Sequence, residues 1–208
     1  NQDDAPEENS GTLLSVRDLF FNTPARMKFI QSKKSEKNQL DKIVKAFLLT
    51  SPEIAFNVKW DDNDKSVYPA KSLEKLDERV AEVLKKSRPL KLKEFKGEYD
   101  GISFKVFLSR ESSRGNAGKS QFIFVNKRLV QDAAIHKIIL NSAQRLWPLG
   151  ETGHYCAYID LAADALDVNI HPNKTQVKFY ESAKVYSLVS SVIKEGTKAE
   201  SEPARDIR

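Results

Sequence analysis

Two runs of basic residues are the first feature of this sequence that could do chemistry. The first run contains seven basic residues and only two acidic ones, Glu36 and Asp41. Its basic residues are Arg26, Lys28, Lys33, Lys34, Lys37, Lys42 and Lys45. The second run contains six basic residues and one acidic residue, Glu94. Its basic residues are Lys85, Lys86, Arg88, Lys91, Lys93 and Lys96. Clusters of this kind bind a polyanion such as the DNA backbone without regard to base sequence. On charge alone, however, a solvated helix face is the simpler interpretation.

Residues that bind metals or act as nucleophiles are few. The chain has one cysteine, Cys156, and three histidines, His136, His154 and His171, and the histidines show no metal-ligand spacing. Cys156 lies in an alternating apolar run, which favours a core position over a nucleophile. A single cysteine excludes an intrachain disulfide and fits a reducing compartment. The sequence therefore predicts no metal centre and no thiol chemistry, and His171 is interpreted as a structural residue of a turn.

Composition places the chain among soluble globular proteins, because 40% of its residues are hydrophobic and 30% are charged. No run approaches the roughly 20 apolar residues that span a bilayer. Residues 1–10 are acidic and do not resemble a signal peptide. The chain does not begin with Met, and we expect it to be a piece of a longer protein.

Hydrophobic periodicity predicts the elements that position these residues. Apolar residues at spacings of three and four predict helices at about 32–49, 73–84, 132–146 and 185–193. Alternation or β-branched content predicts strands at 11–17, 54–60, 66–70, 102–108, 121–125 and 155–161, and residues 90–95 are expected to lead into the strand at 102–108. Asn22-Thr23-Pro24 is typical of a helix start, and 112–118 of an exposed loop. The predicted fold class is α+β, a mixed β-sheet of about five strands covered by helices.

Three segments resemble one known family. Residues 11–29 read GTLLSVRDLFFNTPARMKF, residues 124–132 read FVNKRLVQD, and residues 167–179 read DVNIHPNKTQVKF. All three are similar, in the same order, to signature segments of the MutL family of DNA mismatch-repair proteins. With the elements between them, the resemblance covers roughly residues 10 to 196.

The resemblance implies a domain organisation. Residues 1–31 would be the C-terminal end of an ATP-binding lobe, and 32–196 the second, transducer-like domain. Residues 197–208 lie beyond the resemblance, and their polar composition predicts a disordered tail. The second domain of this family resembles a ribosomal protein and has a left-handed βαβ crossover, against the usual hand.

The resemblance also implies site residues. Lys174, the catalytic and ATP-binding candidate, would reach from the second domain to the γ-phosphate of ATP, where an ammonium suits a terminal phosphate. Gly11 and Thr12 would belong to the ATP site, with the Thr12 hydroxyl supporting the group that reads adenine. Asn22 and Arg26 also match the family pattern, but a helix cap and a surface charge explain them at least as well.

Arg128 stands where the family carries a DNA-contacting arginine, and Lys127 replaces the usual glycine there. Because glycine tolerates positive φ and lysine does not, this departure could mean a different turn. The added charge would not harm phosphate binding. Both residues are therefore DNA-binding candidates, with an ordinary exposed arginine as the alternative for Arg128.

Several parts of an ATPase are missing. Only eight glycines occur and none forms a phosphate-binding loop, and no segment resembles the family's catalytic glutamate helix. Positioning and charge supply most of the rate in phosphoryl transfer, so we expect this chain alone to be inactive. The resemblance implies ATP and Mg²⁺ as cofactors of the complete protein, and no cofactor for the fragment.

The resemblance implies several partners, namely DNA, the missing ATP-binding lobe, a mismatch-recognition protein and a second copy in a dimer. It implies no membrane, and a cytoplasmic location in bacteria or a nuclear one in eukaryotes. Two other functions remain open. One is the transducer domain of a type II topoisomerase ATPase subunit, although the second and third segments argue against it. The other is a ribosomal-protein-like nucleic-acid-binding module, which leaves residues 11–29 unexplained.

Overall fold

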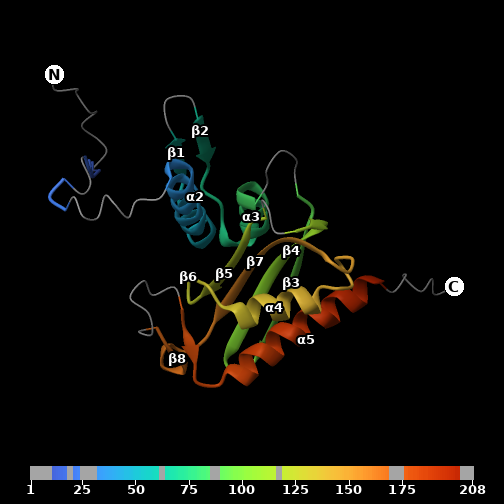
Figure 1. Ribbon diagram of the computed structural model, residues 1–208. Coiled ribbons are helices and arrows are strands. Elements are labelled where there is room, and N and C mark those ends of the chain that lie inside the picture. The colour runs from blue at the N-terminus through green and yellow to red at the C-terminus, as the bar shows by residue number, and fades with distance from the viewer. Residues whose placement is uncertain are drawn as a thin grey trace. The chain divides into compact units, whose positions relative to one another are not determined.

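The computed structural model describes residues 11–17, 21–23, 32–60, 64–84, 90–115, 119–168 and 176–201 (Figure 1). The chain divides into two compact units, residues 1–42 and 43–208. The larger unit holds the β-sheet and all of its covering helices except the first part of α2 (Lys33–Thr50). That helix begins with a cap, because the backbone N–H of Ser35 donates to Oγ of Ser32 at 3.3 Å.

A five-stranded sheet forms the centre of the larger unit, in the order β3-β4-β7-β5-β6. The strands are β3 (Leu92–Tyr99), β4 (Ile102–Arg114), β5 (Gln121–Val125), β6 (Arg128–Val130) and β7 (Glu151–Asp160). β5 and β7 pair in parallel and the other neighbours pair antiparallel. The sheet is therefore mixed, which confirms the predicted fold class. The crossover from β5 to β7 contains β6 and helix α4 (Ala133–Ser142), and its left-handed sense stays a prediction.

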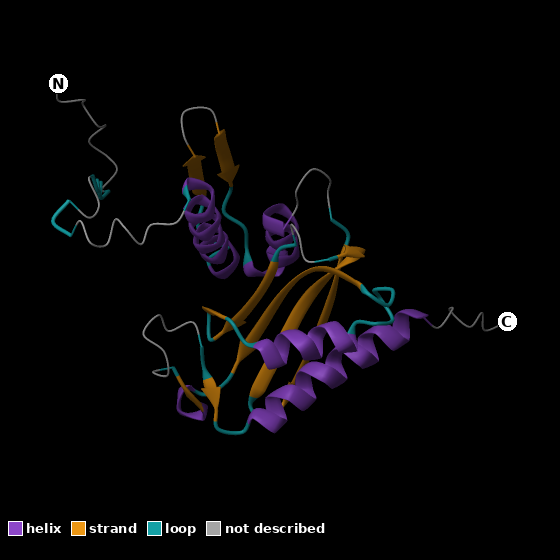
Figure 2. Ribbon diagram, in the orientation of Figure 1, coloured by secondary structure: helices purple, strands orange, loops and turns teal. Residues whose placement is uncertain are grey.

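Helices α4 and α5 (Ser182–Ser201) cover one face of this sheet (Figure 2). Every second residue of β4 points into that layer, where Ile102, Phe104, Val106 and Leu108 are all buried. Burying each such side chain contributes about 1.5–3 kcal/mol. α5 lies close to the edge strand β3 because Gly196 leaves room for the Phe95 ring, where a Cβ would collide with it.

The opposite face of the sheet is covered in part. Helix α3 (Leu76–Leu84), preceded by the 3₁₀ turn η1 (Leu73–Lys75), packs there with Leu48 and Leu49 of α2. Their apolar side chains meet the strand residues that alternate with those of the first face. These strand residues are Phe107, Phe122, Phe124 and Cys156. A second, smaller core results.

A buried arginine ties a hairpin to helix α3. Strands β1 (Phe56–Trp60) and β2 (Asp64–Tyr68) pair antiparallel, as predicted. Arg79 is 0% exposed and donates from Nη2 to the carbonyl oxygens of Pro52 at 3.1 Å, Ile54 at 3.3 Å and Pro69 at 2.5 Å. These carbonyls belong to the chain entering and leaving the hairpin, so one guanidinium holds both of its ends.

A second small ladder closes near the start of α5. β8 (Leu166–Asp167) pairs with β9 (Lys178–Phe179), so that Leu166 lies opposite Phe179 and Asp167 opposite Lys178. Leu166 and Phe179 are buried in the core under α4 and α5. Among the described helices, none has the length and apolar content needed to cross a membrane.

Four sequence predictions about the elements need correction. Residues 11–17 form no strand, and Leu13 and Leu14 are exposed. A strand needs a hydrogen-bonded neighbour, which composition alone does not supply. β4 continues to Arg114, beyond the loop predicted from residue 112, because Ser112 and Ser113 pair with β7.

The other two corrections concern helices. The apolar residues whose spacing predicts the helix at 32–49 were expected to face a core, but Leu40, Ile43 and Phe47 are 51%, 50% and 60% exposed, while Leu48 and Leu49 are buried. Helix α5 continues to Ser201, past the end expected near residue 196, because Thr197 is buried and its hydroxyl donates to the Ile193 carbonyl at 2.8 Å. Of the predicted helix start, Pro24 lies outside the described residues, as does the rest of the predicted tail, 202–208.

Candidate nucleic-acid interface

The turn between β5 and β6 carries the two DNA-binding candidates. Val125 pairs with Arg128, so Asn126 and Lys127 form a two-residue hairpin loop. Their φ angles are 47° and 62°, the combination of a type I′ turn. Lys127 therefore adopts the positive φ that glycine favours, so lysine in place of glycine is compatible with this conformation. A cost of about 1–2 kcal/mol accompanies a non-glycine residue in this region.

Asn126 fastens this turn to the end of β7. Its side-chain amide donates to the Leu161 carbonyl at 3.0 Å, and its side-chain oxygen accepts from the Leu161 N–H at 3.0 Å. Its own N–H donates to the Ile159 carbonyl at 2.9 Å. Three hydrogen bonds thus fix the residue that precedes Lys127, and the turn is held rigidly against the sheet.

Lys127 and Arg128 are both exposed at this fixed turn. Within the described part of the chain, neither makes an ion pair with a carboxylate. Exposed cations that no neighbouring acid neutralises are suited to a phosphate, which an arginine can bind with two parallel hydrogen bonds. The structure thus brings these two predicted residues together on one turn.

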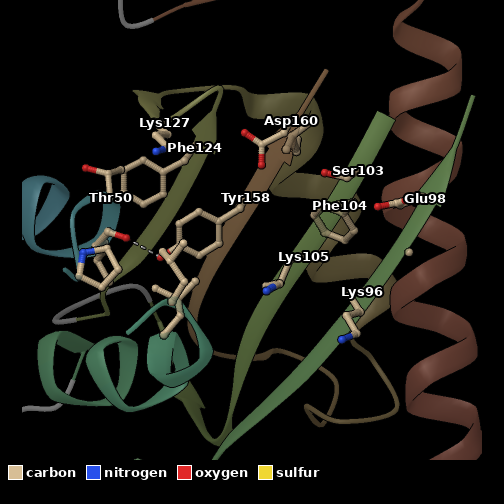
Figure 3. Close-up of a pocket in the computed structure, with 16 residues that line it drawn as sticks. Thr50, Lys96, Glu98, Ser103, Phe104, Lys105, Phe124, Lys127, Tyr158 and Asp160 are labelled. Atoms are coloured by element: carbon tan, nitrogen blue, oxygen red, sulfur yellow. Dashed lines mark hydrogen bonds between the residues drawn. The ribbon is translucent and has the colours of Figure 1, made fainter. Parts of the chain in front are cut away.

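Lys127 also lines a pocket on the partly covered face of the sheet (Figure 3). The pocket encloses about 610 Å³ between the end of α2, the start of α3 and strands β3, β4 and β7. Its charged lining residues are Lys96, Glu98, Lys105, Lys127 and Asp160. None of these was predicted as a site residue apart from Lys127, although Lys96 belongs to the second basic run.

The Tyr158 ring forms an apolar wall of this pocket. Its hydroxyl donates to the Leu49 carbonyl at 3.0 Å, and its ring stacks on Phe124 with the centroids 5.3 Å apart. Burial raises the pKa of Tyr158, so the hydroxyl stays protonated and keeps donating. The ring is thus held at both ends.

Lys174 lies outside the described residues, as do Asn169 to Thr175 around it. The described residues on either side meet in the β8–β9 ladder, where the N–H of Tyr180 also donates to the Ala165 carbonyl at 3.1 Å. Val168 and Val177 pack against the core beside it. The segment that carries Lys174 therefore starts and ends at one anchored place.

Gly11 and Thr12 are described and exposed. They belong to the unit of residues 1–42, and none of the described hydrogen bonds involves the Thr12 hydroxyl. Asn22 is exposed as well, and Arg26 lies outside the described residues. The residues that Asn22 would cap lie outside the described residues, and the predicted nucleotide roles of Gly11 and Thr12 stay predictions.

The two basic runs are only partly described. Lys34 and Lys37 are exposed, whereas Lys42 and Lys45 are half-buried on α2. In the second run Lys91 and Lys96 are exposed and Lys93 is half-buried, while Lys85, Lys86 and Arg88 lie outside the described residues. Neither run is therefore a uniformly exposed stripe.

Other reactive groups are built into the cores. Cys156 is buried and its pKa is raised by burial, which keeps it a thiol, as predicted for a core residue. Nδ1 of His136 lies 2.7 Å from the Tyr155 hydroxyl, and burial lowers the pKa of this histidine. Over the described ranges, no three His, Cys, Asp or Glu side chains gather as a metal site.

Sequence reasoning did not identify Asn126 or Tyr158 as site residues. Asn126 had a detectable signal, because asparagine at the first position of a two-residue hairpin loop favours a type I′ turn. Tyr158 had none, since an alternating strand does not reveal which part of a face the helices leave open.

Comparisons with known proteins define first the class and then the family. Residues 80–198 match the family model described as DNA mismatch repair protein, C-terminal domain. Solved structures with this fold include the ATPase domain of the mismatch repair endonuclease MutL from Aquifex aeolicus. That structure is 25% identical with a TM-score of 0.59, over 85% of this chain and 59% of that one. The class is thus a DNA mismatch-repair protein with the fold found in MutL ATPase domains.

The curated relatives identify the family. MutL of Clostridium tetani is 32% identical over 182 residues, and MutL of Parabacteroides distasonis is 29% identical over 187 residues. These alignments cover 87% and 90% of this chain but 29% and 30% of the relatives. The chain belongs to the MutL family of DNA mismatch-repair proteins, and it spans about 30% of the length of the curated relatives it matches. Membership removes the two alternatives that the sequence left open.

Proposed function

We propose that this chain is the part of a MutL-type ATPase that binds DNA without sequence specificity and completes the ATP site through Lys174. One observation carries the DNA half of the proposal, the rigid turn that presents Lys127 and Arg128 to solvent. Three hydrogen bonds fix Asn126, and the two cations that follow it have no described ion-pair partner. A contact fixed in this way positions a phosphate and reads no bases.

Duplex binding by the complete protein tests this contact. Arg128→Glu should weaken binding to mixed-sequence duplexes alike, because it replaces a phosphate contact with a repulsion. The slope of log affinity against log salt should become shallower by about 0.9, because the variant neutralises one phosphate fewer. Lys65→Glu is the matched control, because Lys65 is an exposed cation on the separate β1–β2 hairpin. Binding by Arg128→Glu equal to that of Lys65→Glu at two salt concentrations would place the DNA surface elsewhere.

Support for the ATP half comes from the MutL segment around Lys174 and from the anchored ladder on both sides of it. A solved relative with 25% identity and a TM-score of 0.55 is described as the Aquifex aeolicus MutL ATPase domain complexed with ADP. In the complete protein, Lys174→Ala should lower ATP turnover and weaken the preference for ATP over ADP, since ADP lacks the γ-phosphate. Unaltered turnover and unaltered nucleotide preference would reduce Lys174 to an ordinary surface lysine.

The 208-residue chain alone should not hydrolyse ATP. ATP and Mg²⁺ belong to the complete protein in this proposal, because no glycine-rich phosphate loop occurs in the sequence. Turnover that copurifies with this chain and disappears in Lys174→Ala would contradict the proposal. The partners it implies are an ATP-binding lobe, a mismatch-recognition protein and a second copy of the protein.

A further inference from the structure

The outer edge of β3 is the longer of the two edges of the five-stranded sheet. β3 has eight residues, whereas β6 at the other edge has three. Its register with β4 is unbroken from Leu92 to Tyr99. Natural edge strands are usually short or bent by a bulge, because a long regular edge pairs readily with another strand. Among the described strands none lies on the outer side of β3, so this edge is open to pairing.

The main-chain groups that face away from β4 belong to Glu94, Lys96 and Glu98. The Arg110 N–H donates to the Lys91 carbonyl at 2.9 Å, so these two residues are a hydrogen-bonded pair. Hydrogen-bonded and non-hydrogen-bonded pairs alternate along an antiparallel ladder. Odd-numbered residues of β3 therefore direct their N–H and carbonyl groups toward β4, and Glu94, Lys96 and Glu98 direct theirs outward. Within the described ranges, no hydrogen bond to these outward groups is found.

Helix α5 runs beside this edge and makes it one wall of a groove (Figure 3). The groove encloses about 670 Å³ between residues 94–99 of β3 and two neighbouring rows of α5 residues. The inner row packs on β3 so closely that a Cβ at Gly97 would lie 2.6 Å from Cγ2 of Val192. The outer row is exposed and consists of Ser187, Ser191 and Glu195. An extended chain beside β3 would bond to the strand and pack on the helix, which is the geometry of β-strand addition.

This groove is acidic, although the chain as a whole carries a formal net charge of +5. Three carboxylates line it, those of Glu94, Glu98 and Glu195. The opposing charge is a single ammonium group, that of Lys96. The Glu94 carboxylate lies 4.0 Å from the Lys105 ammonium, whereas Glu98 and Glu195 make no ion pair with any described side chain. A groove of this charge repels nucleic acid and favours a basic occupant.

The order of the charges along β3 specifies the occupant further. Glu94, Lys96 and Glu98 lie on one face of the strand, with the two carboxylates about 14 Å apart. Opposite charges on adjacent strands stabilise a sheet, so the best neighbour has a basic, an acidic and a basic side chain at alternate positions.

We propose that this groove binds an extended segment of a partner protein with that charge pattern. The segment adds a strand to β3 and packs its other side chains on α5. The inference goes beyond the proposed function, because it concerns recognition of a protein segment at the sheet edge opposite the one that carries Arg128.

Binding of a synthetic peptide to the complete protein tests the proposal. The probe is a fluorescent peptide of about ten residues, with lysine, glutamate and lysine at alternate positions and valine or serine between them. Glu98→Lys should weaken its binding about tenfold, because the new lysine repels the basic side chain opposite. Of the two peptides in which one lysine is replaced by glutamate, one should recover the affinity lost in this variant. Glu53→Lys is the matched control, since Glu53 is exposed, lies outside the groove and makes no ion pair with a described side chain.

Two further arms separate strand addition from a general attraction of charges. Methylating every second peptide nitrogen keeps all charges, and it should abolish binding for the set of nitrogens that faces β3 but not for the other set. Ser191→Trp fills the groove beside α5 and keeps every β3 residue, and it should also weaken binding. Equal binding of the two methylated peptides, equal binding of a peptide with the same residues in scrambled order, or unchanged binding by a folded Ser191→Trp would overturn the proposal.

Absence of peptide binding would also overturn the proposal, and the self-association of the complete protein then shows what the edge does instead. If the peptide does not bind and Glu98→Lys reduces self-association in sedimentation, the groove belongs to a second copy of the chain. If the peptide does not bind and self-association is unchanged, the charged side chains of β3 only keep its edge from pairing.

Discussion

The two faces of the five-stranded sheet differ in what covers them. Under α4 and α5 the strands contribute a continuous apolar layer that includes Phe104, Val106, Ala157 and Ile159. On the opposite face, residues of the same strands change along their length. The end near α3 is apolar at Phe107, and the other end carries Ser103 and Asp160.

The difference follows from how many helices each face receives. Among the described elements, two helices bury the first face, whereas α3 and the last turns of α2 bury only part of the second. Charged side chains that remain at the uncovered end contribute little to packing, so they are free to serve binding. The covered face therefore supplies stability, and the β5–β6 turn beside the open end of the other face supplies the proposed DNA contact.

The largest expected effect is a difference in stability between substitutions at two neighbouring residues of β4. Phe104→Ala should lower the free energy of unfolding by about 3–5 kcal/mol, because it leaves a cavity under the helices. Ser103→Ala, which points to the open face, should change it by less than about 0.5 kcal/mol. Urea denaturation of both variants measures the contrast. Similar losses in the two variants would show that the open face is also part of the core.

A smaller effect of opposite sign is expected at the β5–β6 turn. Lys127→Gly removes the strain of a positive φ, but glycine also increases the conformational entropy of the unfolded chain. The first effect is the larger, so the free energy of unfolding should rise by about 0.5 kcal/mol. Asn126→Gly also relieves a positive φ but removes two hydrogen bonds to Leu161, and should destabilise the protein by about 1 kcal/mol. Thermal melting of the two variants compares them. Stabilisation by both would mean that the Asn126 bonds do not hold the turn.

The smallest effect is a pH dependence confined to the covered face. Burial lowers the pKa of His136 below its usual value of 6.5, so the unfolded chain takes up the proton first as the pH falls. Stability should therefore decrease as the pH drops below about 6.5 and level off below the folded-state pKa. His136→Asn should flatten this part of the profile, measured by denaturation between pH 7 and pH 5. An unchanged profile in that variant would assign the dependence to another group.

Much of the covered face could be predicted from the sequence. The alternation of Tyr155, Ala157 and Ile159 and the helical spacing of Ile135 and Ile139 identify buried residues by period alone. The strand at 11–17 could not be predicted correctly, because its leucines have the right composition but no described neighbour pairs with them.

The site residues were predicted from the resemblance to family motifs rather than from hydrophobic periodicity. Arg128 was found from the segment FVNKR, and the structure adds the turn that fixes it. Arg79 shows the limit of periodicity, since it lies next to Val80 on an amphipathic helix and nothing in its spacing indicates a fully buried guanidinium. The pocket could not be predicted from the sequence either. Which residues are cross-strand neighbours, such as Lys96 and Lys105, depends on the strand register, and the sequence does not specify it.

Lysine footprinting tests the contrast between the two faces most directly. The complete protein would be treated with an amine-reactive acylating reagent, with and without DNA, and the modification of each lysine measured by mass spectrometry. DNA should protect Lys127, and leave unchanged the reactivity of Lys137 on α4 and Lys194 on α5, which are exposed on the helical layer. Protection of Lys137 and Lys194 with full reactivity at Lys127 would contradict the account.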